Sequence, residues 1–177
     1  MSLEKWTKLS SEVFHKNKWW QGLHDRFRLP NGKEGDYFYT KTPGAVMIIA
    51  VDNNGKVLLH RQYRYLFDKE SLELPCGGIK PGQTTEEAAR AELAEETNFQ
   101  AETMEFIGTC GTAPALMKEI FYVFLAKGLS PVLVEKDDTE FFDQVRMSPN
   151  EIDSAIQSGE IFCSPTITGW VLAKPFL

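Results

Sequence analysis

The chain has 177 residues and a formal net charge of −6, with 42% hydrophobic and 25% charged residues. This length suits one domain with a substantial core, and the composition is ordinary for a globular protein. The acidic balance argues against a nucleic-acid coat protein and a polybasic membrane binder. The sequence also contains no membrane-length apolar stretch and no signal-peptide pattern. We therefore expect neither a nucleic-acid partner nor a membrane partner.

The cysteines Cys76, Cys110 and Cys163 are widely spaced and odd in number. They form neither a zinc pattern nor a redox pair. Reduced cysteines are typical of the cytoplasm, so we expect a cytoplasmic protein.

The first 43 residues are predicted to form a strand arm, followed by the main domain at 44–177. Residues 22–29 alternate apolar and polar, and an Asn-Gly turn leads to a return strand at 36–40. Before them, Trp19 and Trp20 stand in a mixed aromatic segment. Their rings either pack at a hydrophobic rim or dimer interface, or stack on a nucleobase.

The main domain begins with residues 45–51, which are apolar throughout and predict a strand buried on both faces. A turn then leads into a strand at 56–64, whose end carries Arg61 and Arg64. These guanidinium groups either face solvent or bind phosphate oxygens in a forked geometry. Many strands interrupted by one acidic helix predict an α+β fold.

Residues 72–99 contain an apolar strand end, a Gly/Pro turn and an acidic helix. Gly77 and Gly78 allow the turn to bend sharply and to approach a ligand. Thr84 and Glu87 have the spacing of a capping box, which predicts a helix that begins directly after Thr84.

The helix carries Glu92, Glu95 and Glu96, which fall within an arc of roughly 100°. Carboxylates at this spacing repel one another, so the group is either a solvated acidic face or a cation site. The Gly-rich turn directly upstream favours the cation site. Hard oxygen ligands suit Mg²⁺, with Mn²⁺ as the alternative.

Beyond this helix, residues 102–108 and 119–126 are predicted strands, and residues 128–137 are predicted to form a loop. Ser148 and Glu151 form a second capping box, which predicts a short helix ending before Gly159. Another helix is predicted to begin at Ser164.

Residues 72–99 resemble the Nudix box, whose pattern is Gly-x5-Glu-x7-Arg-Glu-aliphatic-x-Glu-Glu-x-Gly-aliphatic. The matching positions are Gly77, Glu92, Leu93, Glu95, Glu96 and the apolar Phe99. Three positions depart from the pattern: Gln83 replaces the first Glu, Ala91 the Arg and Asn98 the second Gly. In the family, that Glu and Arg form a charged pair supporting the metal-binding glutamates, and here both charges are absent.

Further local matches extend the resemblance over most of the chain. Arg61 to Arg64 resembles the Arg-Gln-Tyr-Arg run of ADP-ribose and nucleotide-sugar Nudix enzymes, and Leu29 to Gly32 resembles their hairpin. Pro114 stands at about the distance after the box that is associated with the ADP-ribose group. The resemblance implies a Nudix-type α/β/α sandwich with a mixed sheet and an N-terminal strand region.

The resemblance also implies roles for acidic residues. The metal ligands would be Glu92, Glu95, Glu96, the backbone carbonyl of Cys76, and Glu119. The catalytic candidates are Glu140, Asp138 and Glu95, of which Glu140 is our first choice and Asp138 our second for activating the attacking water.

Substrate contacts are implied in the same way. Gly77 and Gly78 would let the turn approach the phosphates, and Arg61 or Arg64 would hold the far phosphate. Pro114 marks the substrate group. The N-terminal arm would hold the base through Trp19 or Trp20 and reach the partner subunit of a homodimer.

The leading interpretation is a Mg²⁺-dependent hydrolase of ADP-ribose or a nucleoside diphosphate sugar, producing a nucleoside monophosphate and a sugar phosphate. An alternative is a Nudix hydrolase of a dinucleoside polyphosphate, a dinucleotide cofactor or a nucleoside triphosphate. A third is a nucleotide sensor without catalysis. Retention of Glu92, Glu95 and Glu96 argues against the sensor.

Overall fold

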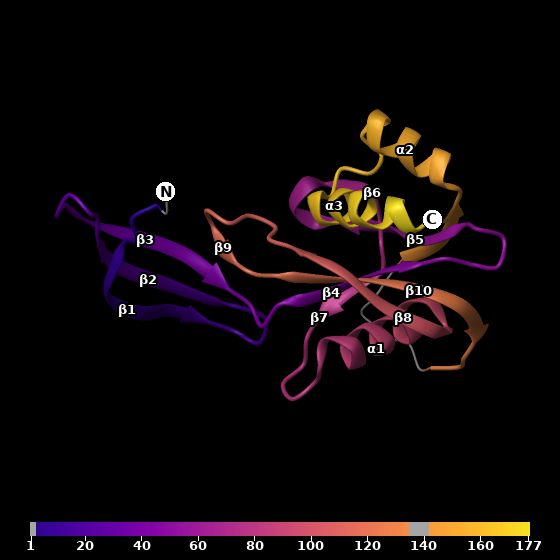
Figure 1. Ribbon diagram of the computed structural model, residues 1–177, viewed down its shortest axis with the longest axis horizontal. Coiled ribbons are helices and arrows are strands. Elements are labelled where there is room, and N and C mark those ends of the chain that lie inside the picture. Colours follow the sequence, from indigo (N-terminus) through magenta and orange to yellow (C-terminus); the bar gives the residue numbers. More distant parts are fainter. Residues whose placement is uncertain (1–2, 135–141) are drawn as a thin grey trace. The chain divides into compact units, whose positions relative to one another are not determined.

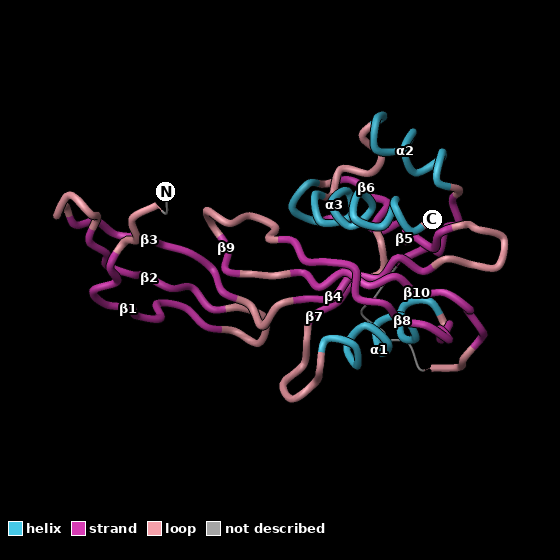
Figure 2. The backbone as a smooth tube through the Cα atoms, viewed as in Figure 1, coloured by secondary structure: helices cyan, strands magenta, loops and turns pink. Residues whose placement is uncertain are grey.

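The computed structural model describes residues 3–134 and 142–177. The chain divides into two compact units, one formed by residues up to Pro43 together with Gly111–Glu119, the other by Gly44–Cys110 and Ile120–Leu177. Figures 1 and 2 show their helices and strands. None of the described helices is both long and apolar enough to cross a membrane.

The first unit is a sheet in the order β1-β2-β3-β9. Its strands are β1 (Thr7–Lys16), β2 (Gln21–Arg28), β3 (Glu34–Lys41) and the short β9 (Met117–Lys118). The antiparallel pairing of β2 with β3 confirms the predicted hairpin, and β9 runs parallel to β3. We did not expect residues 111–119 to join the arm, because their pairing partner is distant in the sequence.

The second unit contains a mixed sheet and a smaller antiparallel sheet. The mixed sheet has the order β7-β4-β10-β8, formed by β7 (Cys76–Gly78), β4 (Ala45–Ala50), β10 (Phe121–Pro131) and β8 (Phe99–Cys110). Only the β4–β10 pair in it is parallel among the described strands. The smaller sheet consists of β11 (Phe142–Met147), β5 (Val57–Arg64) and β6 (Lys69–Glu73). Single-turn helices η1 (Tyr65–Phe67) and η2 (Lys174–Phe176) complete the described elements.

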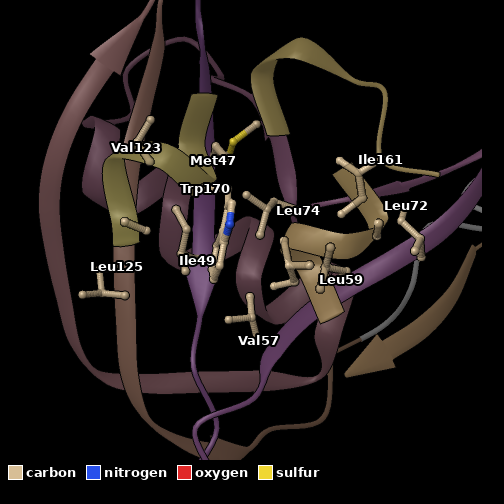
Figure 3. Packing of buried hydrophobic residues seen from close by; sticks show 13 residues of the cluster. Met47, Ile49, Val57, Leu59, Leu72, Leu74, Val123, Leu125, Ile161 and Trp170 are labelled. Carbon is tan, nitrogen blue, oxygen red and sulfur yellow. The ribbon is translucent and has the colours of Figure 1, made fainter. Parts of the chain in front are cut away.

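Strand β4 is buried on both faces, as its sequence predicts. Met47 and Ile49 pack with Trp170 of α3 (Ser164–Ala173) and with α2 (Pro149–Ser158) (Figure 3). Val46 and Ile48 pack instead with α1 (Thr85–Thr97). The period-two alternation of a strand therefore supplies two cores, with α1 on one side and α2 and α3 on the other (Figure 1). This confirms the α/β/α sandwich with a mixed sheet.

The helices begin where their capping boxes predict. The Thr84 hydroxyl accepts a bond from the Glu87 backbone N–H at 3.2 Å, and the Glu87 carboxylate accepts one from the Thr84 N–H at 2.8 Å. Asn98, at φ 57°, ends α1 in the left-handed conformation that Asn tolerates. Ser148 and Glu151 cap α2 in the same way.

The predicted loop at 128–137 is wrong in its first part. Strand β10 continues to Pro131 because β8 is long enough to pair with it, placing Ser130 opposite Gln100 and Pro131 opposite Phe99. Strand β11 was also missed. Residues 135–141 lie outside the described part of the chain.

An ion pair between the partly exposed Arg64 and the buried Glu73 joins β5 to β6. Glu73 is only 1% exposed, and it accepts bonds from Arg64 Nε at 2.7 Å and from Arg64 Nη2. Burial disfavours the ionised form of Glu73 and is the largest single influence on it. The hydrogen bonds and positive charge of Arg64, with smaller contributions from Cys163 and Ser71, together outweigh burial and hold the pKa of this carboxyl below its ordinary value. The pair therefore stabilises the hairpin as long as both groups are charged.

We predict that Arg64→Leu lowers the free energy of unfolding by about 3 kcal/mol at neutral pH, since it leaves a buried carboxylate unpaired. A carboxyl with a depressed folded pKa contributes stability above its unfolded pKa and loses it as pH falls through the folded value. In the variant, Glu73 takes up a proton at higher pH than in the wild type. The stability difference should therefore shrink between about pH 7 and pH 4 in urea titrations.

Arg61→Leu is the matched control on the same strand, because its carboxylate partners Glu160 and Glu70 are exposed. This substitution should lower the free energy of unfolding by less than about 1 kcal/mol. Two results would contradict a stabilising role for the Arg64–Glu73 pair. One is an equal loss of stability in both variants, and the other is a loss in Arg64→Leu that does not change with pH.

Candidate active site

The glutamates of α1 lie in different surroundings. Glu92 and Glu96 are 7% and 8% exposed, because the i, i+4 spacing places both on the buried side of the helix. Glu95 is partly exposed, and Lys80 Nζ lies 3.4 Å from each of its carboxylate oxygens. Two nearly buried carboxylates and one paired surface carboxylate thus make up the predicted acidic group.

Glu96 connects three elements through a single oxygen atom. Its Oε2 accepts a bond from the backbone N–H of Cys76 in β7 at 3.0 Å. The same atom lies 2.9 Å from Nε2 of His60 in β5. The end of α1 is therefore tied both to the glycine turn and to the smaller sheet.

Glu92 occupies the space beside Gly77. A Cβ atom at position 77 would lie 2.1 Å from Glu92 Oε2, which is far inside van der Waals contact. Only glycine leaves room here for the carboxylate. This contact gives a physical reason for the glycine that begins the turn, in addition to the backbone freedom expected from the sequence.

Cys76 does not offer a thiolate to this site. Burial and the negative charge of Glu96 raise the pKa of its thiol well above the ordinary value, so the thiol stays protonated at neutral pH. Its backbone N–H is bonded to Glu96. The backbone carbonyl is the ligand that the sequence resemblance implies, and that assignment stays a prediction.

The residues around the turn fit a hard divalent cation. Glu92 and Glu96 provide carboxylate oxygens at low exposure, next to a glycine whose missing side chain makes room for the Glu92 carboxylate. Within residues 3–134 and 142–177, however, no group of three or more His, Cys, Asp or Glu side chains already has a metal-binding arrangement. Carboxylate oxygens suited to a divalent cation are therefore present, but the described side chains are not already arranged as a metal-binding group.

The two predicted phosphate-binding arginines both hold carboxylates. Arg61 Nη2 donates to Glu160 Oε1 at 2.8 Å, and its Nη1 lies 3.6 Å from Glu70. Arg64 is held by the buried Glu73. Gly78 pairs with Ala45 across the β7–β4 ladder, and a Cβ atom added to it would meet none of the described residues within 4 Å.

Four further predicted residues belong to the first unit. Glu119 accepts bonds from the hydroxyls of Thr42 and Thr112 at 2.9 and 3.1 Å. Trp19 and Trp20 follow β1, and the backbone N–H of each donates to Asn17 Oδ1 at 2.9 Å. Pro114 lies in the segment that precedes β9. Their functional roles stay predictions.

The preferred water-activating acids, Glu140 and Asp138, lie outside the described residues. Two residues near Glu96 were missed by sequence reasoning. His60 is 2% exposed, and Gln144 donates through Nε2 to the carbonyls of Glu96 at 3.2 Å and Thr97 at 2.7 Å. A histidine that follows the apolar run Val57 to Leu59 was the available signal, because a buried polar side chain needs a partner.

The comparisons with known proteins agree with this geometry. Residues 40–163 match the NUDIX domain, and residues 6–40 match the nucleoside diphosphate sugar hydrolase N-terminal domain. A crystal structure of an ADP compounds hydrolase superimposes with a TM-score of 0.89 at 25% identity, covering 100% of this chain and 96% of that one.

Two relatives are similar over most of their length. The ADP-ribose pyrophosphatase of Bacillus subtilis (strain 168) is 35% identical over 141 residues, covering 78% of this chain and 76% of the relative. The methanol dehydrogenase activator of Bacillus methanolicus is 33% identical over 145 residues, covering 81% of this chain and 78% of the relative. With a domain match over more than half of its length and a glutamate helix against a glycine turn, the chain belongs to the Nudix hydrolase family.

Proposed function

We propose that the chain hydrolyses the diphosphate linkage of ADP-ribose or a nucleoside diphosphate sugar, releasing a nucleoside monophosphate and a sugar phosphate. The observation that carries this proposal is the pair of nearly buried carboxylates, Glu92 and Glu96, packed against the turn at Gly77. Nudix hydrolases generally need a divalent metal ion. We propose Mg²⁺ for this role, with Mn²⁺ as the alternative.

The substrate class is supported by the names of relatives. They include ADP-ribose pyrophosphatases and the GDP-mannose pyrophosphatase of Yersinia enterocolitica, and the N-terminal match names nucleoside diphosphate sugars. The exposed rings of Trp19 and Trp20 suit stacking on a nucleobase. A homodimer formed through the N-terminal arm, without a nucleic-acid partner, is part of the same proposal.

The chemistry requires that water attack one phosphorus of a negatively charged linkage. A divalent ion held at this site would neutralise the phosphate oxygens and would make the attacking water easier to deprotonate. Glu92, Glu95, Glu96 and the carbonyl of Cys76 would hold the ion. Glu140, or Asp138 in its place, would take the proton of the attacking water, and the bridging oxygen would leave with the other phosphate.

The experiment is a substrate panel with Mg²⁺ or Mn²⁺ in ¹⁸O-labelled water. We expect ADP-ribose or a nucleotide sugar to be consumed fastest, with ¹⁸O in only one of the two monophosphate products, because only one phosphorus is attacked. Faster turnover of a dinucleotide or a triphosphate would favour the alternative Nudix activities. No turnover of any diphosphate would favour a sensor.

We predict that Glu96→Gln slows hydrolysis by roughly 100-fold or more, since loss of a metal ligand should cost at least as much as loss of its hydrogen-bonded support. The amide oxygen can still accept bonds from Cys76 and His60, so the thermal midpoint should change little. Glu86→Gln, at an exposed position in the first turn of α1, is the control. Near-wild-type turnover of Glu96→Gln would refute the ligand assignment.

We also predict that Gly77→Ala weakens Mn²⁺ binding by about tenfold or more, because the new methyl group displaces the Glu92 carboxylate. Titration calorimetry with Mn²⁺ measures this directly. Gly78→Ala adds the same methyl group one residue later, where no described residue lies within 4 Å, and should bind Mn²⁺ normally. Equal affinities in the two variants would show that Glu92 does not bind the ion.

A further inference from the structure

Strands β5 and β11 each direct one polar side chain to the end of α1. His60 and Gln144 are direct partners in the β5–β11 ladder. His60 contacts the side chain of Glu96, and Gln144 contacts its backbone carbonyl. One cross-strand pair therefore holds both the carboxylate and the main chain of the same residue.

The contact of His60 with Glu96 identifies which ring nitrogen donates. An ionised carboxylate only accepts hydrogen bonds, so Nε2 carries the proton that lies between His60 and Glu96. Nδ1 is buried without a hydrogen-bond partner among the described residues. Nε2 is therefore the atom through which His60 orients the Glu96 carboxylate.

The aromatic ring of Phe142 limits the movement of His60. The two ring centroids are 4.4 Å apart, and Phe142 begins β11, two residues before Gln144. The histidine is 2% exposed, so water does not compete effectively for its N–H. The donor is thus fixed in position before any ligand binds.

Gln144 acts on the helix end. The last carbonyls of a helix lack partners within the helix. Gln144 Nε2 donates to the carbonyls of Glu96 and Thr97, at 3.2 and 2.7 Å. These bonds hold the final turn of α1 against β11, so they set the backbone position from which the Glu96 carboxylate projects.

In the family pattern, a Glu and an Arg form a charged pair that supports the metal-binding glutamates. In this chain the two positions are occupied by the uncharged Gln83 and Ala91. The Gln83 side chain accepts a bond from the Lys80 backbone N–H at 3.0 Å and so serves the turn, while Ala91 has no polar group. We propose that His60 and Gln144 are positioning residues that hold Glu96 in place of that pair. The inference rests on the proposed function, because it assigns Glu96 to the metal site.

The first test compares His60→Leu with His60→Gln by titration calorimetry and by the electron paramagnetic resonance of free Mn²⁺. Leucine fills the space without a donor, whereas the glutamine amide can reproduce the Nε2 donor. We expect Mn²⁺ affinity to fall about 10–100-fold in His60→Leu and to stay within about threefold of wild type in His60→Gln. Equal affinity in wild type and a folded His60→Leu would overturn the role of His60.

The second test uses Gln144→Leu, which remains informative if His60→Leu does not fold. We expect Mn²⁺ affinity to fall about tenfold or more. Gln100→Leu is the matched control, since Gln100 Nε2 donates only to the Ser130 hydroxyl on an exposed strand pair among the described contacts. Weakening of the same size in both variants would overturn the role of Gln144.

The outcomes separate this inference from the proposed function. A wild-type protein that binds Mn²⁺ but hydrolyses no diphosphate refutes the function, while the affinity differences among variants still support the positioning role. A wild-type protein that hydrolyses ADP-ribose, with His60→Leu and Gln144→Leu unchanged in Mn²⁺ affinity, refutes the positioning role alone.

Discussion

The structure of the site depends on one shared acceptor, the Oε2 atom of Glu96. Removing a carboxylate from water is costly unless hydrogen-bond donors replace the solvent. The Cys76 N–H and His60 Nε2 provide those donors from two different strands. Because both bonds require the helix end, the glycine turn and β5 to be in register, burial of this carboxylate couples the two sheets of the second unit to the chemistry of α1.

Most of the fold was predictable because its signals are local. The uniform apolarity of β4 indicates two covered faces, and the capping boxes at Thr84 and Ser148 fix where α1 and α2 begin. What sequence reasoning missed depends on pairing between distant segments. Strand β10 continues beyond Gly128 because β8 extends alongside it and pairs with it. Residues 111–119 join the first unit because β9 pairs with β3.

The residues of the site also fall into two groups, those that local sequence signals predict and those that depend on pairing between distant segments. The acidic residues of α1 were found because helical periodicity alone brings them to one side. His60 and Gln144 were not found, since they lie 36 and 48 residues from Glu96 and reach it only through the β5–β11 ladder. A buried histidine can be suspected from an apolar run, but its partner cannot be deduced without the pairing.

The carboxylate partners also distinguish the two arginines that the sequence left equivalent. A substrate phosphate that displaced Glu73 from Arg64 would leave a carboxylate that is 1% exposed without its counter-ion. That exchange is expensive. Arg61 holds Glu160 and Glu70, which are exposed and can return to water at little cost. If one of the two arginines gives up its carboxylate to bind phosphate in the proposed reaction, the energetics favour Arg61, whereas the contact of Arg64 with Glu73 maintains the hairpin.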